Sequence, residues 1–152
     1  MAMTDVQPTI VESIAIKAPI AAVYAAVTTP EQLTKWWGSD ESYHTASMEA
    51  DVRPGGAWKT TGNARGGGTF SVSGIYRAVE PPSLVEFTWR HDWSDGADQP
   101  ETLVRYDLVE RDGVTTITVM HSGFITEADY NDHLNCWKTV LGWLHGFLTP
   151  SA

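Results

Sequence analysis

Two histidines and a tyrosine are the side chains of this sequence best suited to moving a proton near neutral pH. His121 ends a segment of alternating residues, Tyr106 belongs to another, and His133 lies in a stretch with helical periodicity. All three share the apolar side of their segments, so they are predicted to face the interior. There they are candidates for a general acid or base. Core histidines that bond to a backbone carbonyl fit the same pattern.

Other catalytic patterns are missing from the sequence. There is no Ser-His-Asp order and no G-x-S-x-G elbow. The glycines at 66–68 lack the following Lys-Ser/Thr of a phosphate loop, and the acidic segment 92–98 lacks calcium-ligand spacing. The histidines show no i, i+4 pairing for a metal, and Cys136 lies in a predicted helix interior, where a thiol is usually inert packing. We therefore expect no metal and no cofactor.

Seven tryptophans among 152 residues indicate an aromatic-lined interior. Aromatic walls with a few polar groups are the usual composition of a small-molecule pocket. We expect Gly74 to leave a gap on the inward face, and Trp37, next to an inward-packed Trp36, to lie at the cavity rim. The residues predicted to bind a ligand are Trp37, Trp58, Phe70, Tyr76, Phe87, Trp89, Tyr106, His121, His133, Trp137 and Leu141.

Composition limits the classes of function. With 10 Lys+Arg against 19 Asp+Glu, the net charge of −9 disfavours binding to nucleic acid or to anionic lipid. A single cysteine excludes an internal disulfide framework. The start of the chain lacks a signal-peptide pattern, and no apolar run approaches the ~20 residues of a membrane span. We expect a cytoplasmic protein with one domain over residues 1–152, of which 1–8 form a flexible N-terminus.

The positions of prolines and glycines divide the chain into elements. A strand is predicted over 9–17, and a helix over 20–27 opens at Pro19. Thr29 as N-cap and Pro30 at the first helical position start a second short helix. Six further strands follow, the last two joined by an Asp-Gly hairpin. They are predicted over 47–51, 57–62, 69–79, 84–90, 102–110 and 114–121.

A long helix completes the chain, from Thr126 as N-cap to Pro150. Its apolar residues recur at helical spacing. An antiparallel sheet has one buried face, and this helix is the one element long enough to cover it. The prediction is therefore an α+β fold with six to seven antiparallel strands and the C-terminal helix across their concave side.

That order of elements, together with specific residues, resembles the START-like superfamily (SRPBCC, including polyketide cyclases and the birch-pollen allergen). Within it, the chain is most similar to the family of homologues of the activator of the heat-shock chaperone ATPase. The resemblance spans about Ile10 to Leu148. The residues that carry it are Ala18-Pro19, Val23-Tyr24, Thr28-x-Pro30-Glu31-x-Leu33-x-x-Trp36-Trp37, Arg53-Pro54-Gly55-Gly56, Gly74-x-Tyr76, Pro81-Pro82, Phe87-Thr88-Trp89, Thr115-x-Ile117-x-Val119-x-His121 and His133-x-x-Cys136-Trp137 with Leu141 and Leu144.

The resemblance implies a helix-grip fold, a curved sheet around the long helix with a cavity between them. It does not fix the activity, because the family includes chaperone co-activators, ligand carriers and cyclases. Our first hypothesis is a module that binds a small hydrophobic or aromatic ligand in this cavity. The alternatives are a cyclase, dehydratase or hydrolase that uses His121, His133 or Tyr106 in the same cavity, and a chaperone-interacting protein. The sequence leaves open whether a reaction is catalysed and whether the default homodimer forms.

Overall fold

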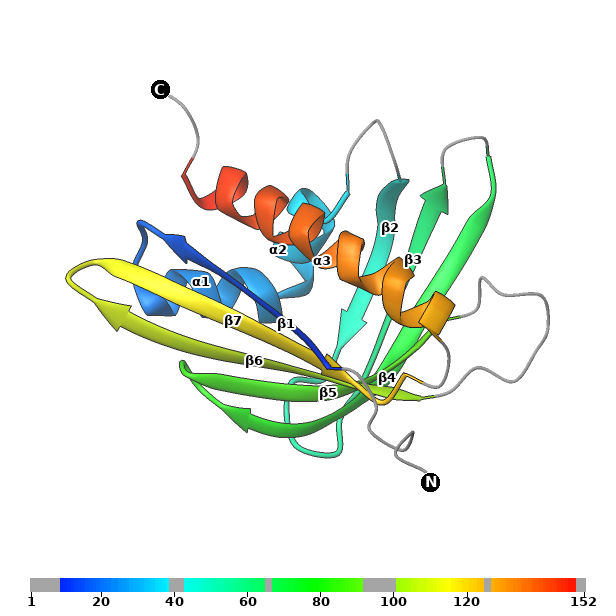
Figure 1. Ribbon diagram of the computed structural model, residues 1–152, viewed down its shortest axis with the longest axis horizontal. Coiled ribbons are helices and arrows are strands. Elements are labelled where there is room, and N and C mark those ends of the chain that lie inside the picture. The colour runs from blue at the N-terminus through cyan, green and yellow to red at the C-terminus, as the bar shows by residue number, and fades with distance from the viewer. Residues whose placement is uncertain (1–8, 39–42, 65–66, 92–100, 125–126, 150–152) are drawn as a thin grey trace.

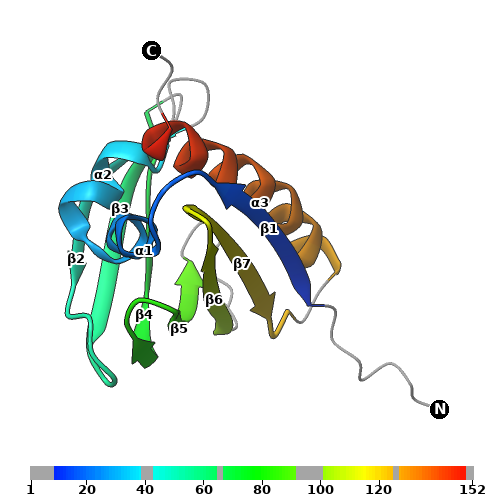
Figure 2. The ribbon, with the colours of Figure 1, turned by 90° about the vertical axis from the view of Figure 1, so that its left-hand side faces the viewer.

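Seven antiparallel strands form one curled sheet that wraps around a long C-terminal helix (Figures 1 and 2). The computed structural model describes residues 9–38, 43–64, 67–91, 101–124 and 127–149. The strand order is β1-β7-β6-β5-β4-β3-β2, so consecutive strands from β2 to β7 are neighbours and β1 closes the edge beside β7. The α+β helix-grip prediction is confirmed.

The elements agree with the predicted order. The strands are β1 (Ile10–Ile16), β2 (Tyr43–Ala50), β3 (Ala57–Ala64), β4 (Thr69–Glu80), β5 (Leu84–His91), β6 (Thr102–Arg111) and β7 (Val114–Ser122). The helices are α1 (Ile20–Thr28), α2 (Pro30–Trp36) and α3 (Glu127–Leu148). Thr126 and segment 92–100 lie outside the described residues.

The start of β2 is the largest difference from the predicted boundaries. The strand begins at Tyr43 rather than at Ser47, and its register with β3 shifts between Thr45 and Ser47. This part of the chain has no apolar alternation, so only its pairing with β3 defines it. Thr29 occupies the predicted N-cap of α2, but its side chain makes no capping hydrogen bond.

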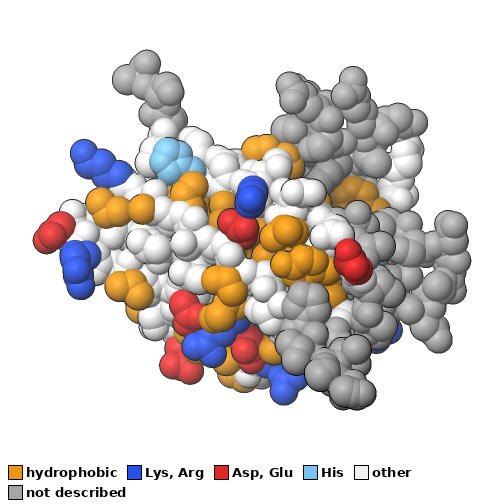
Figure 3. Space-filling view, viewed as in Figure 1, with side chains coloured by type: hydrophobic (Ala, Val, Ile, Leu, Met, Phe, Trp, Pro, Cys, Tyr) orange, Lys and Arg blue, Asp and Glu red, His pale blue; other side chains and the backbone are white. Residues whose placement is uncertain are grey.

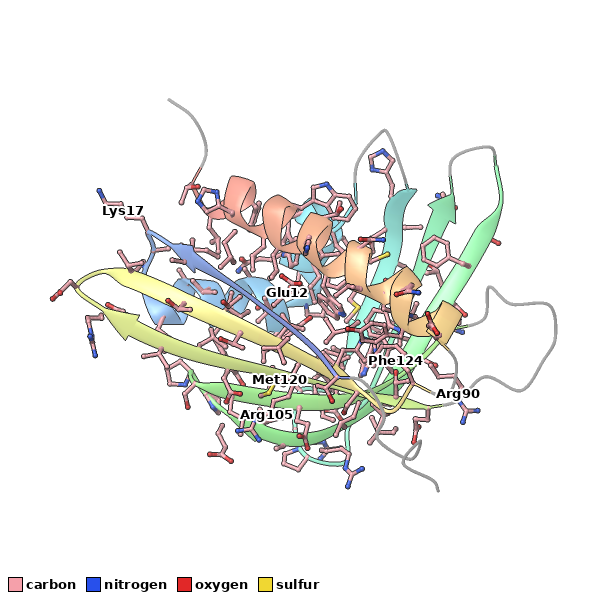
Figure 4. The ribbon with its side chains drawn as sticks, in the orientation of Figure 1. Glu12, Lys17, Arg90, Arg105, Met120 and Phe124 are labelled. Carbon is pink, nitrogen blue, oxygen red and sulfur yellow. The ribbon has the colours of Figure 1, made fainter. Side chains whose placement is uncertain are left out.

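The concave face of the sheet holds the core. Along β5, β6 and β7 alternate side chains are buried, and α3 lies across them (Figure 2). On α3 the buried side chains include Trp137, Leu141 and Leu144, at the spacing of one helical face. Phe124, labelled in Figure 4, follows β7 close to the start of α3 and is almost fully buried. This face therefore fixes the position of α3 over the sheet.

The convex face of the sheet carries mixed charges. On β6 the Arg105 Nε donates to Asp107 Oδ2 at 2.8 Å, and Arg105 points away from α3 (Figure 4). In the space-filling view, acidic and basic side chains lie beside one another along the lower edge (Figure 3). Surface pairs of this kind contribute little to stability. Within the described residues, no helix is long and apolar enough to cross a membrane.

Gly74 does not leave the gap that the sequence suggested. Its cross-strand partner Trp58 swings its indole over it, and Trp58 Nε1 donates to the Thr88 carbonyl at 3.2 Å. A Cβ at position 74 would collide with that carbonyl oxygen and lie 2.7 Å from Trp58 Nε1. Glycine is required here because backbone and indole occupy the space that a side chain would take.

We expect Gly74→Ala to lower the free energy of unfolding by about 1–3 kcal/mol or more, because the methyl group overpacks this contact. Chemical denaturation measures the change. The matched control is Gly142→Ala on the exposed side of α3, where a Cβ meets nothing within 4 Å. That control should raise stability by about 0.5–1 kcal/mol. Equal effects at the two positions would contradict the packing described for Gly74.

Candidate functional site

A cavity of about 430 Å³ lies between α3 and the concave side of the sheet. All three helices and five of the strands contribute to its wall. Among the residues that the structure describes, the lining side chains are mostly aromatic or aliphatic, and none is Asp, Glu, Lys or Arg. They are Val27, Leu33, Trp37, Thr45, Met48, Trp58, Thr60, Thr61, Phe70, Val72, Tyr76, Phe87, Trp89, Tyr106, His133, Cys136, Trp137 and Val140.

The structure brings most of the predicted ligand-binding residues to this wall. Nine of the eleven line the cavity, namely Trp37, Trp58, Phe70, Tyr76, Phe87, Trp89, Tyr106, His133 and Trp137. The other two are buried elsewhere in the core. Leu141 is 4% exposed and His121 is fully buried, and neither is among the lining side chains.

Sequence reasoning missed several lining residues. Val72 alternates with Phe70 and Gly74 along its strand, and Val140 recurs at helical spacing with Trp137 and Leu144, so periodicity could have identified both. Thr45 and Met48 could not be found in this way, because they lie in β2, where the alternation is weak. The edge of the cavity at β2 and β3 is thus defined by strand pairing alone.

Trp37 connects the parts of the cavity wall. It is half-buried, and its ring centroid lies 5.9 Å from that of Trp137 on α3 and 6.3 Å from that of Trp89 on β5. Its backbone carbonyl accepts a 2.7 Å hydrogen bond from Thr45 Oγ1 on β2. Trp36 packs inward and donates its Nε1–H to the Ala26 carbonyl. Trp36 is the last residue of α2, whereas Trp37 is its C-cap with an extended backbone, which separates the directions of the two side chains.

His121 is held in a chain of hydrogen bonds behind the cavity wall. Trp137 Nε1 donates to His121 Nδ1 at 3.0 Å, so Nδ1 carries no proton. His121 Nε2 is therefore the protonated nitrogen and donates to Thr102 Oγ1 at 2.7 Å. Thr102 Oγ1 in turn donates to the Trp89 carbonyl at 3.1 Å. Both ring nitrogens are engaged, which leaves His121 no free position for proton transfer.

Burial keeps the His121 imidazole neutral. Loss of hydration, and then the neighbouring His133 and His91 side chains, lower the pKa of His121 to about 2. His121 is thus not suited to acid–base chemistry near neutral pH. Its ring contacts include Phe124, at a centroid distance of 4.5 Å, and His133, at 5.0 Å. It is a bonded core histidine, but its partners are the side chains of Thr102 and Trp137 rather than the backbone carbonyl that the sequence suggested.

The two buried tyrosines of the cavity also keep their protons. Burial raises the pKa of Tyr76 to about 12, and burial raises the pKa of Tyr106 still further. The two side chains pack against Phe87, with centroid distances of 5.9 Å and 5.3 Å. At any physiological pH their hydroxyl groups remain able to donate a hydrogen bond.

Cys136 is not the buried thiol that its place in the helix suggested. It is exposed, and it also contributes to the lining of the cavity. The half-buried side chains of Trp37, Met48 and Phe70 likewise line the cavity. These residues place the mouth of the cavity between α3, the end of α2 and the strands β2 and β4, whereas buried aromatic rings form its floor.

A curled sheet, a helix across its concave side and a cavity between them define a START-like protein of the helix-grip type. A family model described as "Activator of Hsp90 ATPase homolog 1-like protein" matches residues 17–149. The chain belongs to this family, as its resemblance indicated.

Solved structures share the fold over nearly the whole chain. Protein CV1439 from Chromobacterium violaceum is 25% identical, with a TM-score of 0.77, over 94% of this chain and 98% of its own. The AHSA1 protein from Silicibacter pomeroyi is 24% identical, with a TM-score of 0.77, over 91% and 96%. Protein Ms6760 from Mycobacterium smegmatis is 21% identical, with a TM-score of 0.78, over 95% and 92%. No protein with a curated description matches the chain.

The His121 environment predicts a loss of stability in acid. The unfolded imidazole takes up a proton below its ordinary pKa of 6.5, whereas the folded one does so only near pH 2. The contribution of His121 to stability is therefore complete above pH 6.5 and falls below it by about 1.4 kcal/mol per pH unit. Denaturation between pH 7.5 and 4.5 measures the slope, which His121→Gln should reduce.

The NMR spectrum of the wild-type protein gives a test without a variant. The His121 ring should keep its proton on Nε2 and show no titration between pH 8 and 4.5. A His121 resonance that titrates between pH 5 and 8 would contradict the hydrogen-bond chain.

Proposed function

We propose that this protein binds a small, uncharged hydrophobic or aromatic molecule in the cavity between α3 and the sheet. The cavity itself is the observation that carries the proposal. Its volume of about 430 Å³ lies within the ~300–1,000 Å³ of small-molecule pockets. A well-packed core leaves few voids larger than a water molecule, so a space of this size is unusual for a core with no further role.

The lining supports the class of ligand. Aromatic rings supply apolar contact area, and the described part of the lining offers a charged ligand no Asp, Glu, Lys or Arg as a counter-ion. Five of the predicted binding residues lie on β3, β5, β6 and α3 and at the C-terminal end of α2. They are Trp58, Trp89, Tyr106, Trp137 and Trp37. A planar ring could therefore contact aromatic walls on several sides.

Catalysis has less support than binding. His133 and Tyr106 line the cavity, but Tyr106 holds its proton firmly and His121 is fully hydrogen-bonded outside it. A chaperone-docking role, suggested by the family name, needs a contiguous exposed apolar patch. In the described part of the chain, the exposed large hydrophobic side chains are Val11, Ile75 and Val109, which lie on three different strands.

Filling the cavity should abolish binding. Val72→Trp places an indole in the open space, and we expect the affinity for the uncharged fluorescent probe N-phenyl-1-naphthylamine to fall about tenfold or more. The free energy of unfolding should change little, because the larger side chain enters a void. The matched control is Val109→Trp on the convex face of β6, where Val109 is 64% exposed. If both variants bind like the wild type, the ligand site is not this cavity.

Cys136 reports on the mouth of the cavity. Because its thiol is both exposed and part of the lining, saturating N-phenyl-1-naphthylamine should slow its labelling by a maleimide severalfold. Mass spectrometry of timed samples measures the labelling rate. As a control, Val72→Trp should label at the same rate with and without the probe. Protection that persists in Val72→Trp would place the bound probe outside the cavity.

A further inference from the structure

The indole N–H of Trp89 differs from those of the other buried tryptophans. Trp36 Nε1 donates to the Ala26 carbonyl at 2.8 Å, Trp58 Nε1 to the Thr88 carbonyl at 3.2 Å, and Trp137 Nε1 to His121 Nδ1 at 3.0 Å. Trp89 Nε1 is also buried, yet it has no hydrogen-bond acceptor in the described part of the chain. Trp89 is 9% exposed and lines the cavity.

An unsatisfied buried donor is costly. Leaving such a group without a partner costs about 1–3 kcal/mol, and most buried polar side chains in folded proteins are bonded. Three tryptophans in the same core follow that rule, so the exception at Trp89 calls for an acceptor from elsewhere. The cavity that Trp89 lines is the place from which one can come.

Apart from the His133 imidazole and the Cys136 thiol, the described polar groups of the cavity wall are also rich in donors. The threonine hydroxyls at its edge are engaged within the protein, since Thr45 Oγ1 donates to the Trp37 carbonyl and Thr60 Oγ1 to the Ser47 carbonyl. The hydroxyls of Tyr76 and Tyr106 stay protonated because of burial, so they offer donors as well. Among the described lining residues there is no Lys or Arg to favour a carboxylate. These groups complement an oxygen acceptor without charge.

We propose that the ligand is an aromatic carbonyl compound whose neutral oxygen accepts a hydrogen bond from Trp89 Nε1. This inference rests on the proposed binding function and adds the chemistry of the ligand. In this arrangement the ring of the ligand packs among the aromatic walls, and Trp89 selects carbonyl compounds over hydrocarbons of the same shape.

The test uses two probes of equal shape. 2-Acetylnaphthalene and 2-isopropenylnaphthalene differ only in a carbonyl oxygen against a methylene group. We expect the wild-type protein to bind the ketone about fivefold to tenfold more tightly, as a net hydrogen bond of roughly 1 kcal/mol implies. Dissociation constants come from calorimetry, so tryptophan substitutions do not affect the readout.

Trp89→Phe removes the donor and keeps an aromatic ring. We expect it to bring the preference for the ketone to about one. Trp58→Phe is the matched control, because it removes an indole from the same wall whose N–H is already bonded to Thr88. Trp58→Phe should weaken both probes similarly and retain the preference. A preference that survives Trp89→Phe, or that is absent from the wild type, overturns the inference.

A measurement on the wild-type protein covers the case in which Trp89→Phe does not fold. The indole N–H proton resonance of Trp89 should move downfield when the ketone binds and should move much less with the alkene. Equal shifts with the two probes overturn the role of Trp89. If neither probe binds, the proposed function fails together with this inference, whereas equal binding of both probes overturns the inference alone.

Discussion

The placement of one helix over a concave sheet is the constraint on which this structure depends. A hydrogen-bond chain ties the two together at their centre, from Trp137 on α3 through His121 and Thr102 to the backbone of Trp89. Every member is buried, so each bond acts where competing water is absent. These hydrogen bonds hold α3 at a fixed position over β5, β6 and β7, and they fix the tautomer of His121.

The cavity follows from that placement. With α3 held at Trp137, the sheet curls away toward β2, and rigid aromatic rings cannot collapse to fill the space as smaller aliphatic side chains would. Trp37 lies at the junction of α2, α3 and the sheet, and its carbonyl is tied to β2 by Thr45. The same rings that limit packing provide the walls of the candidate binding site.

The polarity of the cavity is equally a product of packing. Four buried tryptophans could each have found an acceptor, but the neighbours of Trp89 are other rings, including Trp58, Trp137 and His133. Their faces exclude water without accepting a conventional hydrogen bond. A buried donor and two protonated phenols therefore remain in a wall whose described residues include no Asp, Glu, Lys or Arg, which gives the cavity a chemical preference as well as a shape.

By itself, the sequence determined the order of elements, the inward faces of β4 to β7 and the apolar face of α3, because alternation and helical spacing express which side chains leave water. It also indicated the family, through motifs spread along the chain. Tertiary structure alone decided three things. Trp58 fills the space at Gly74, His121 is bonded behind the wall while His133 lines it, and Cys136 reaches the mouth. Each depends on a distance between side chains from different elements, and local periodicity carries no information about such distances.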